Sequence, residues 1–359
     1  MTGPGACVHQ AVGQPGVVDV VVVGAGQSGL SGAYFLQRAG LGFAVLDHNP
    51  GPGGAWQHRW PSLTLATANH VHDLPGLPLD ASTPAVRASE VVPGYFGRYE
   101  QHFGLDVARP VHTSAVREGT AGRLDVVTSV GTWQARAVLS ATGTWERPFR
   151  PHYPGTFDGE QLHAADYRTA EAFRGRHVVV VGGGISAVQL LDEISRVTTT
   201  TWVTRREPVW ADGAFRPEDG RQAVARVERR VRAGLPPGSV VSVTGLLLTP
   251  ALRAARDRGV LARREMFARL VPEGVAWADG SVQRAQVVLW CTGFRSALDH
   301  LAPLHLRGPG GGIVMDGELA TRGAAEPRVH LLGYGPSAST IGANRAGRAA
   351  VREVRELLT

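Results

Sequence analysis

The sequence predicts an α/β fold made of two Rossmann-like domains, with the second domain inserted into a discontinuous first one. Two observations lead to this prediction. A unit of strand, glycine-rich turn, helix and strand occurs at residues 17–47 and again at residues 177–204. Two further strands, one on each side of the second unit, end in Thr142-Gly143 and Thr292-Gly293, which indicates that the chain crosses between the domains twice.

The first unit opens with an apolar, β-branched run at residues 17–23, which has the length of a buried strand. The turn Gly24-Ala25-Gly26-Gln27-Ser28-Gly29 follows, then a helical pattern and a strand at residues 43–46 that ends on Asp47. In this context GxGxxG is the dinucleotide-binding fingerprint, because its glycines let a pyrophosphate approach the backbone and the helix N-terminus offers free N–H groups. Asp47 suits a free ribose hydroxyl. The alternative is an ordinary glycine-rich turn between a strand and a helix.

The second unit repeats this pattern, with the GxGxxA turn Gly182-Gly183-Gly184-Ile185-Ser186-Ala187 between a strand at 177–181 and a helix at 188–194. The residue 23 positions after the first glycine is Asp47 in the first unit and Arg205, followed by Arg206, in the second. A carboxylate would repel a ribose 2′-phosphate, whereas a guanidinium can bind it with two hydrogen bonds. The second site is therefore predicted to take NADP(H). The alternative is a solvated pair of surface arginines.

The remaining elements follow from the spacing of apolar residues. Strands are predicted at 124–128, 132–141, 200–204, 287–290 and 329–332, helices at 91–103, 221–233, 249–257 and 342–357, and a hairpin at 275–280. Proline-rich stretches are interpreted as a loop at 60–79 and a linker at 145–167. The predicted domains are a flexible tail at 1–16, a first domain at 17–144 and 292–359, and a second domain at 145–291 with an insertion at about 212–259.

The composition is that of a globular protein, with 43% hydrophobic and 19% charged residues, and argues against large-scale disorder. The longest apolar runs are only strand-sized, and residues 1–15 contain no apolar stretch of the signal-peptide type, so we expect a cytoplasmic protein without a membrane span. Cys7 and Cys291 lie far apart and form no CxxC motif. This argues against a disulfide framework, a structural zinc site and a dithiol redox centre.

The net charge is +6 and every strongly basic residue is an arginine. This bias is typical of a GC-rich bacterial genome. The arginines are scattered and do not form the basic stripe with interleaved aromatic residues that a nucleic-acid-binding protein shows.

Four motifs of the chain resemble those of the flavin-containing monooxygenases. The first GxGxxG with Asp47 resembles the FAD site of that family, and Gly53-Gly54-Ala55-Trp56 resembles its GGxW motif beside the flavin. Residues 157–167 fit the linker motif FxGxxxHxxxY, with His163 and Tyr167 at its last two fixed positions. The second glycine turn with Arg205 resembles the NADPH site. The resemblance extends from residue 18 to the last helix.

The resemblance implies which residues contact each cofactor. The implied FAD contacts are Gly24, Gly26, Gln27, Ser28, Gly29, Asp47, Gly54, Trp56, Thr142, Gly143 and Gly333. The implied NADPH contacts are Gly182, Gly184, Ser186, Ala187, Arg205, Arg206, Thr292 and Gly293. Trp56, Asn69 and His163 are candidates for a catalytic role. For Trp56 the alternative is a packing role, and for His163 it is a plain hydrogen bond in the domain linker.

Two departures from the family are visible. Many members have an asparagine at the position that aligns near Ala66, whereas Asn69 lies three residues later in this chain. Gly333 is not followed by the acidic residue usual in the third FAD contact. The first departure leaves the substrate class open.

The resemblance implies a monooxygenase that uses NADPH and O2 to oxygenate a small-molecule nucleophile, by N- or S-hydroxylation, through a C4a-(hydro)peroxyflavin. Tyr167 favours this branch, because the related Baeyer–Villiger enzymes usually have Trp there. The alternatives are an NADPH-dependent FAD reductase or oxidase, a Baeyer–Villiger-type oxygenase, and a non-catalytic cofactor-binding protein. The expected partners are the small-molecule substrate and O2, with neither nucleic acid nor membrane, and a homodimer is left open.

Overall fold

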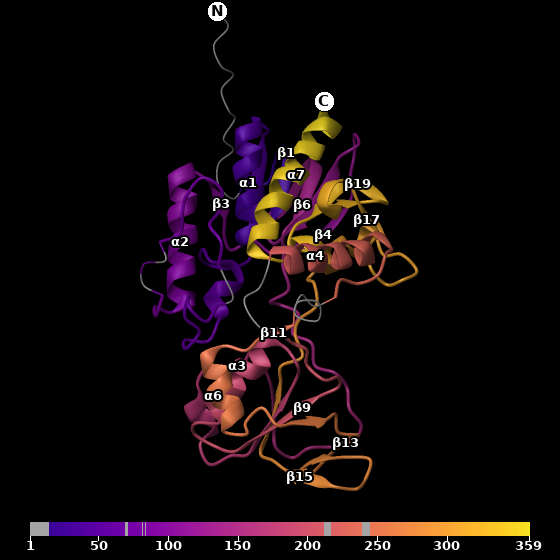
Figure 1. Ribbon diagram of the computed structural model, residues 1–359. Helices are drawn as coiled ribbons and strands as arrows, with labels where there is room; N and C mark the ends of the chain where they lie inside the picture. Colours follow the sequence, from indigo (N-terminus) through magenta and orange to yellow (C-terminus); the bar gives the residue numbers. More distant parts are fainter. Residues whose placement is uncertain (1–13, 69–70, 81, 83, 212–216, 239–244) are drawn as a thin grey trace, which may run out of the picture. The chain divides into compact units, whose positions relative to one another are not determined.

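The chain forms two compact units in a computed structural model that describes residues 14–68, 71–80, 82, 84–211, 217–238 and 245–359. The first unit combines Met1–Gly143, Val224–Gly238 and Ser296–Thr359, and the second combines Thr144–Ala223 and Ser239–Arg295 (Figure 1). Each unit is an α/β layer structure around a sheet whose central strands run parallel, so the predicted fold class is confirmed.

The first unit is built on a large mixed sheet. Its elements are β1 (Val17–Val23), α1 (Gln27–Ala39), β2 (Phe43–Leu46), η1 (Gly54–His58), α2 (Ala88–Phe103), β3 (Val107–Ala108), β4 (Thr113–Glu118), β5 (Leu124–Thr128), β6 (Gly131–Ser140), η3 (Asp299–Leu304), β17 (Met315–Asp316), η4 (Glu318–Ala320), β18 (Arg322–Gly323), β19 (Glu326–Leu331), η5 (Gly335–Ser337) and α7 (Thr340–Leu358). Within the described residues this sheet has nine strands, in the order β17-β18-β19-β6-β1-β2-β3, and the β4–β5 hairpin joins it through β6. The strands from β19 to β3 run parallel, and their carboxyl ends therefore share one edge.

Helices α1 and α7 lie side by side against the parallel strands (Figure 1). The central valines of β1 are fully buried, as expected for a strand covered on both faces. The two helices approach closely because α7 carries a glycine at the crossing. A Cβ on Gly347 would lie only 2.7 Å from Ser31 Oγ of α1. This contact fixes α1, and with it the glycine turn at the start of α1.

The second unit contains a smaller parallel sheet. Its elements are β7 (Glu160–His163), η2 (Ala170–Phe173), β8 (Val178–Val181), α3 (Ile185–Ile194), β9 (Thr200–Thr204), β10 (Trp210–Ala211), β11 (Leu246–Leu247), α6 (Pro250–Asp257), β12 (Arg263–Glu265), β13 (Arg269–Val271), β14 (Gly274–Ala276), β15 (Val282–Arg284) and β16 (Val287–Trp290). In the described part of the unit, five parallel strands follow the order β12-β9-β8-β16-β7. A separate antiparallel sheet contains β13, β14 and β15.

Two parts of the second unit differ from the sequence prediction. The stretch 145–167, interpreted as a linker, contains β7, which pairs with β16 in the parallel sheet. Part of the predicted insertion at 212–259 belongs to the first unit: helix α4 (Pro217–Arg232) ends there, with Val231 fully buried in a cluster that includes Leu301 and Ile313. Residues 212–216 and 239–244 of that insertion lie outside the described residues.

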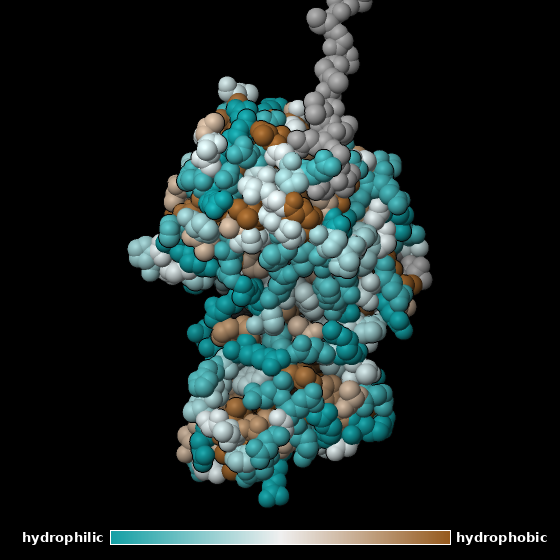
Figure 2. All heavy atoms as spheres, turned by 180° about the vertical axis from the view of Figure 1, so that it is seen from behind, coloured by the Kyte–Doolittle hydropathy of each residue, from teal (hydrophilic) through white to brown (hydrophobic). Residues whose placement is uncertain are grey.

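The surface is predominantly hydrophilic on the face shown in Figure 2, with hydrophobic residues in small scattered groups. Among the large apolar side chains of the described residues, the most exposed are Val17 and Val209, which belong to different units. None of the helices in the described ranges combines the length and apolar character of a membrane span.

Candidate functional site

The first glycine turn joins β1 to α1 in the first unit. Gly24 has a φ of +98°, and a Cβ there would lie 2.6 Å from the carbonyl oxygen of Ala141. A Cβ on Gly29 would lie 1.8 Å from the Gly24 carbonyl oxygen. The positive φ and the two close approaches explain why glycine is required at both positions. Gly26 is the N-cap of α1 and no side chain caps it, so the helix presents its first N–H groups openly.

Two other glycine loops converge on this helix N-terminus. A Cβ on Gly54, at the start of η1, would lie 2.9 Å from the Gly26 Cα. A Cβ on Gly333, after β19, would lie 3.0 Å from Ser28 Oγ in the first turn of α1. Three loops that are distant in sequence thus form one cradle of bare backbone. Side chains larger than hydrogen would fill it, and an extended anionic group such as a dinucleotide pyrophosphate fits it.

Asp47 follows β2 and is buried beside the turn, with only 3% of its surface exposed. Its Oδ2 accepts a hydrogen bond from the Ala25 backbone N–H at 2.6 Å. Its Oδ1 accepts from the backbone and side-chain nitrogens of Asn49, at 2.7 and 2.9 Å. The His58 ring lies 2.9 Å from Asn49 Oδ1 and ties the network to η1. A carboxylate has about four acceptor sites, so Asp47 shapes the turn and keeps capacity for a ribose hydroxyl.

Gln27, the first residue of α1, has a buried polar atom for which the described residues provide no hydrogen-bond partner. Its Nε2 donates to Asn344 Oδ1 and to the His72 carbonyl, both at 3.3 Å, whereas its Oε1 is buried without a hydrogen bond. Asn344 in turn donates to the Asp73 carbonyl at 2.6 Å. An orphaned acceptor at the mouth of the cradle fits a ligand that brings a donor. The residues of the first turn therefore fit a dinucleotide.

Trp56 lies in η1 and is partly buried against the core of the first unit. The guanidinium of Arg59 stands 5.7 Å from the centre of the Trp56 ring. Burial lowers the pKa of Arg59 to about 10, so this side chain remains a cation at neutral pH. Sequence reasoning assigned no role to Arg59, since an isolated arginine after GGxW gives no pattern by which it could be found.

The second glycine turn joins β8 to α3 in the second unit. Gly182 has a φ of +143°, and a Cβ there would lie 2.2 Å from the Cys291 carbonyl oxygen at the end of β16. Gly184 is the N-cap of α3 without a side-chain cap, and a Cβ on it would meet nothing within 4 Å. Ala187 is fully buried where helix and strand must pack closely. The open N-terminus of α3, with Ser186 in its first turn, also fits an anionic ligand.

Arg205 and Arg206 follow β9 directly, and both side chains are exposed. Thr204, the last residue of β9, donates from its hydroxyl to the Arg206 carbonyl at 2.7 Å. Arg263 of β12 lies beside this bond. No sequence pattern pointed to Arg263, because β12 is a short charged strand without an apolar pattern.

His163 ends β7 and is fully buried in the second unit. Its Nδ1 accepts from the Ala165 N–H and its Nε2 lies 3.0 Å from the Gly293 carbonyl, so Nε2 carries the proton. Burial lowers the pKa of His163, which keeps the ring neutral. Tyr167, the last residue of the linker motif, donates to Glu193 of α3 at 2.7 Å. These contacts favour the alternative in which His163 is a linker hydrogen bonder.

The two Thr-Gly exits hold the two chain crossings together. In the first unit, Thr142 Oγ1 donates to the Ala297 carbonyl at 2.7 Å. In the second unit, Thr292 Oγ1 donates to the Phe149 carbonyl, and the Phe149 N–H donates to the Gly293 carbonyl at 2.9 Å. The crossings therefore run antiparallel and side by side. Gly143 and Gly293 both have positive φ, at +64° and +78°.

Asn69 completes the predicted set. It lies outside the described residues, so its catalytic role stays a prediction. Burial raises the pKa of Cys291 to about 12, so its thiol is not a nucleophile at neutral pH.

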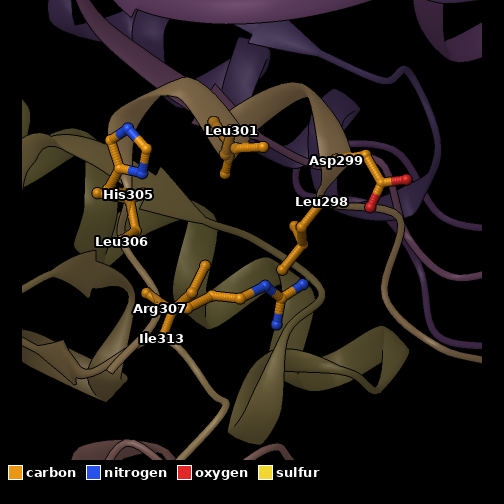
Figure 3. A pocket seen from close by; sticks show the side chains of 8 residues that line it. Leu298, Asp299, Leu301, His305, Leu306, Arg307 and Ile313 are labelled. Atoms are coloured by element: carbon orange, nitrogen blue, oxygen red, sulfur yellow. The ribbon is translucent and has the colours of Figure 1, made fainter. Parts of the chain in front are cut away.

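A pocket in the first unit lies between η3 and the turn that follows it (Figure 3). Its walls are the apolar side chains Leu298, Leu301, Leu306 and Ile313, with His305 and Arg307 beside them. Its volume of about 230 Å³ is too small for a dinucleotide. The lining contains no residue of the sequence-predicted sites.

Comparisons with known proteins identify the family of this chain. The family described as pyridine nucleotide-disulphide oxidoreductase matches residues 21–230. A solved structure of a flavin-containing monooxygenase from Stenotrophomonas maltophilia is 42% identical, with a TM-score of 0.82 over 96% of this chain and 99% of that one. The chain belongs to the pyridine nucleotide-disulphide oxidoreductases and, among them, to the flavin-containing monooxygenase family.

More distant relatives are enzymes or proteins described as oxidoreductases. The uncharacterised oxidoreductase CzcO of Bacillus velezensis is 23% identical, with 78% of this chain and 82% of that protein covered. A Baeyer–Villiger monooxygenase of Streptomyces coelicolor is 28% identical over 61% of this chain and 43% of its own length.

Family membership confirms the resemblance found in the sequence and makes this flavin-containing monooxygenase homologue an oxidoreductase. The predicted cofactors, FAD and NADPH, are those of this family. The wider family name refers to disulfide chemistry, but this chain has two cysteines, at positions 7 and 291, and no CxxC motif.

Proposed function

We propose that this protein is an FAD-dependent monooxygenase that uses NADPH and O2 to oxygenate the nitrogen or sulfur atom of a small-molecule nucleophile. One observation carries the proposal. Two glycine turns with uncapped helix N-termini lead to opposite charges at equivalent positions, a buried carboxylate at Asp47 and the exposed guanidinium groups of Arg205 and Arg206. This difference supports FAD at the first turn and NADPH at the second.

In this proposal the first unit holds FAD. The pyrophosphate meets the N–H groups of α1 in the cradle of Gly24, Gly26, Gly54 and Gly333, and Ser28 lies in the same helical turn. Asp47 accepts from the ribose, and Gln27 Oε1 accepts from a donor on the cofactor. When bound, the flavin supplies hydride acceptance from NADPH and reaction with O2.

The second unit binds NADPH in this proposal. The Gly182–Ala187 turn faces the pyrophosphate, and Arg205 with Arg206 binds the 2′-phosphate. The reaction consumes one NADPH, one proton and one O2 for each substrate. One oxygen atom goes to the substrate nitrogen or sulfur, and the other leaves as water.

Support for an N- or S-oxygenating enzyme comes from Tyr167 at the last position of the linker motif, where Baeyer–Villiger enzymes usually have Trp. Tyr167 is buried, stacks on Phe173 and bonds Glu193. This side chain therefore supports the family branch as part of the fold and is assigned no contact with substrate.

The proposal is tested by anaerobic reduction with NADPH followed by mixing with oxygenated buffer in a stopped-flow spectrometer. We expect a transient near-ultraviolet band, distinct from the oxidised and reduced cofactor, that decays faster when a suitable amine or thioether is added. The oxygenated product should equal the NADPH consumed. Direct reoxidation with one hydrogen peroxide per NADPH, whatever amine or thioether is added, would instead establish an NADPH oxidase or reductase. Oxygen insertion into ketones alone would establish the Baeyer–Villiger alternative.

A further inference from the structure

We propose that Arg263 is a third arginine of the 2′-phosphate site and that it determines the preference for NADPH over NADH together with Arg205 and Arg206. This inference rests on the proposed NADPH site in the second unit. Arg263 begins β12, the edge strand that pairs in parallel with β9. The register places Arg263 opposite Trp202 and two residues before the end of β9, where Arg205 and Arg206 follow.

Hydrogen bonds through Thr204 connect the Arg263 side chain to the backbone of the Arg205–Arg206 pair. The Nε of Arg263 donates to Thr204 Oγ1 at 2.6 Å, and the Thr204 hydroxyl in turn donates a hydrogen bond to the Arg206 carbonyl at 2.7 Å. Arg263 Nη2 lies 3.5 Å from the Thr204 carbonyl oxygen. The two bonds in series hold the backbone of the Arg205–Arg206 turn in one conformation. Arg263 therefore positions the turn as well as adding a charge beside it.

The same threonine borders the glycine turn. A Cβ on Gly183 would lie 3.8 Å from Thr204 Cγ2 and 3.7 Å from Pro208 Cγ. Thr204 is buried, whereas Arg263 is half-exposed. A guanidinium has five N–H groups, and the two bonds to Thr204 leave others for an anionic oxygen.

The charges around this turn favour a phosphate. Arg205 and Arg206 directly follow the carboxyl end of β9, and Arg263 contacts Thr204, the last residue of β9. The carboxylates of Glu207 and Glu265 are exposed in the same stretches of chain, and water screens them. The net charge of these five side chains is positive, which favours a dianionic 2′-phosphate over a free 2′-hydroxyl.

Arg264, the next residue of β12, provides a matched control. Its guanidinium lies 3.6 Å above the centre of the Trp277 ring, and adjacent residues of a strand point to opposite faces. Arg263→Gln and Arg264→Gln remove the same charge from the same strand. Only the first removes the contact with Thr204.

The experiment measures the dissociation constants of 2′,5′-ADP and 5′-ADP by calorimetry on the full chain with its flavin. We expect the wild type to prefer 2′,5′-ADP. In Arg263→Gln the affinity for 2′,5′-ADP should fall about tenfold, while that for 5′-ADP changes less than about twofold. Thr204→Val should reproduce part of this loss, because it removes the relay and keeps all three charges. Arg264→Gln should leave both affinities unchanged.

The outcomes separate the inference from the proposed function. If the wild type binds 2′,5′-ADP no better than 5′-ADP, the assignment of the second site to NADPH fails. If the wild type shows the preference but Arg263→Gln keeps it, only the role of Arg263 is overturned. An equal loss of both nucleotides would also overturn it, because this would show general damage to the fold. A circular dichroism melt of each variant checks that it is folded.

Discussion

Asp47 is the residue on which the shape of the first glycine turn depends. Its carboxylate accepts from the Ala25 N–H inside the turn and from Asn49 after β2. We expect Asp47→Ala to weaken FAD binding by about tenfold or more, since hydrogen bonds to a charged group are lost and the Ala25 N–H is left without its acceptor. Flavin absorbance per protein after dialysis, with FAD titration of the stripped protein, measures the effect.

Asp47→Asn serves as the second variant, because it keeps an oxygen acceptor beside the turn. It should bind FAD with an affinity between those of the wild type and Asp47→Ala. A folded Asp47→Ala protein with unchanged FAD affinity would show that Asp47 has no part in the site.

Arg205 is predicted to recognise the 2′-phosphate of NADPH. Its side chain is exposed after β9, so its removal should affect the bound phosphate far more than the fold. We expect Arg205→Ala to raise the KM for NADPH by about tenfold or more and to leave the KM for NADH nearly unchanged. The control is Arg174→Ala, an exposed arginine of the same unit that pairs with Glu171. Equal effects of Arg205→Ala on both cofactors would contradict the assignment.

At this scale the sequence predicted the residues that carry a motif and missed those that act through tertiary contacts. The glycine turns and Asp47 could be found because strand, turn and helix follow one another within 30 residues. Arg263 lies 59 residues from Thr204 and reaches it only because β12 pairs with β9. The buried ring of His163 is bonded through both nitrogens, which no sequence pattern could reveal.

Among the elements, α4 differs most from its sequence interpretation. The spacing predicted a polar, arginine-rich helix in an insertion of the second domain, but Val227 and Val231 are buried and Val224–Gly238 belongs to the first unit. The end of α4 can approach the first unit closely because residue 335 is a glycine: a Cβ on Gly335 would lie 3.0 Å from Val231 Cγ1. Arg232 also donates to the Gly317 carbonyl at 2.8 Å. The helix thus covers the turn that follows Gly333.

Val231→Asp should destabilise the first unit by about 3 kcal/mol or more, because it buries a carboxylate among apolar side chains. Val224→Asp, on the same helix but 37% exposed, should change the free energy of unfolding by less than about 0.5 kcal/mol. Urea unfolding followed by circular dichroism compares the two variants. Equal stabilities would show that α4 does not pack on the first unit in solution.

Elements with a strong apolar pattern were predicted closely, and those formed by pairing alone were missed. The strands predicted at 124–128, 200–204 and 287–290 have the same bounds in the structure. The strand β7 consists of Glu160–His163, of which only Leu162 is apolar, so it has no alternating pattern and is recognised as a strand only by its pairing with β16. The hairpin predicted at 275–280 corresponds to the antiparallel pair β14 and β15 with the turn between them, whereas the three-residue strands β12 and β13 are too short for any periodicity.

For the molecule as a whole, two buried histidines predict how stability depends on pH. His300 lies 3.0 Å from Ser140 Oγ, and His330 is fully buried in β19. Burial lowers the pKa of both side chains to about 4, and His112 adds to the effect at His300. Below about pH 6.5 these two histidines become protonated in the unfolded chain, whereas in the folded chain they become protonated only near pH 4. The free energy of unfolding should therefore fall across this window, by about 3 kcal/mol for each histidine, and these groups should contribute no slope above it.

Urea unfolding of the wild type and of His330→Gln between pH 4 and 8 checks this prediction. The variant should lose the part of the acid slope that His330 contributes, whereas His102→Gln, at an exposed position of α2, should keep the full slope. An unchanged slope in His330→Gln would mean that other groups cause the acid sensitivity.

The side-by-side crossings bear on how such proteins can exchange parts during evolution. Because the chain leaves and rejoins the first unit at neighbouring points, a gene segment for residues 144–295 resembles a cassette that recombination could replace at two junctions. Yet that cassette also encodes Val224–Gly238, which is core material of the host unit. A chimera that exchanges all of residues 144–295 would place the end of a foreign helix against the native core of the first unit. A chimera that exchanges only 144–223 and 239–295, and therefore has four junctions, would gain a new nucleotide-binding unit and keep the native core of the first unit.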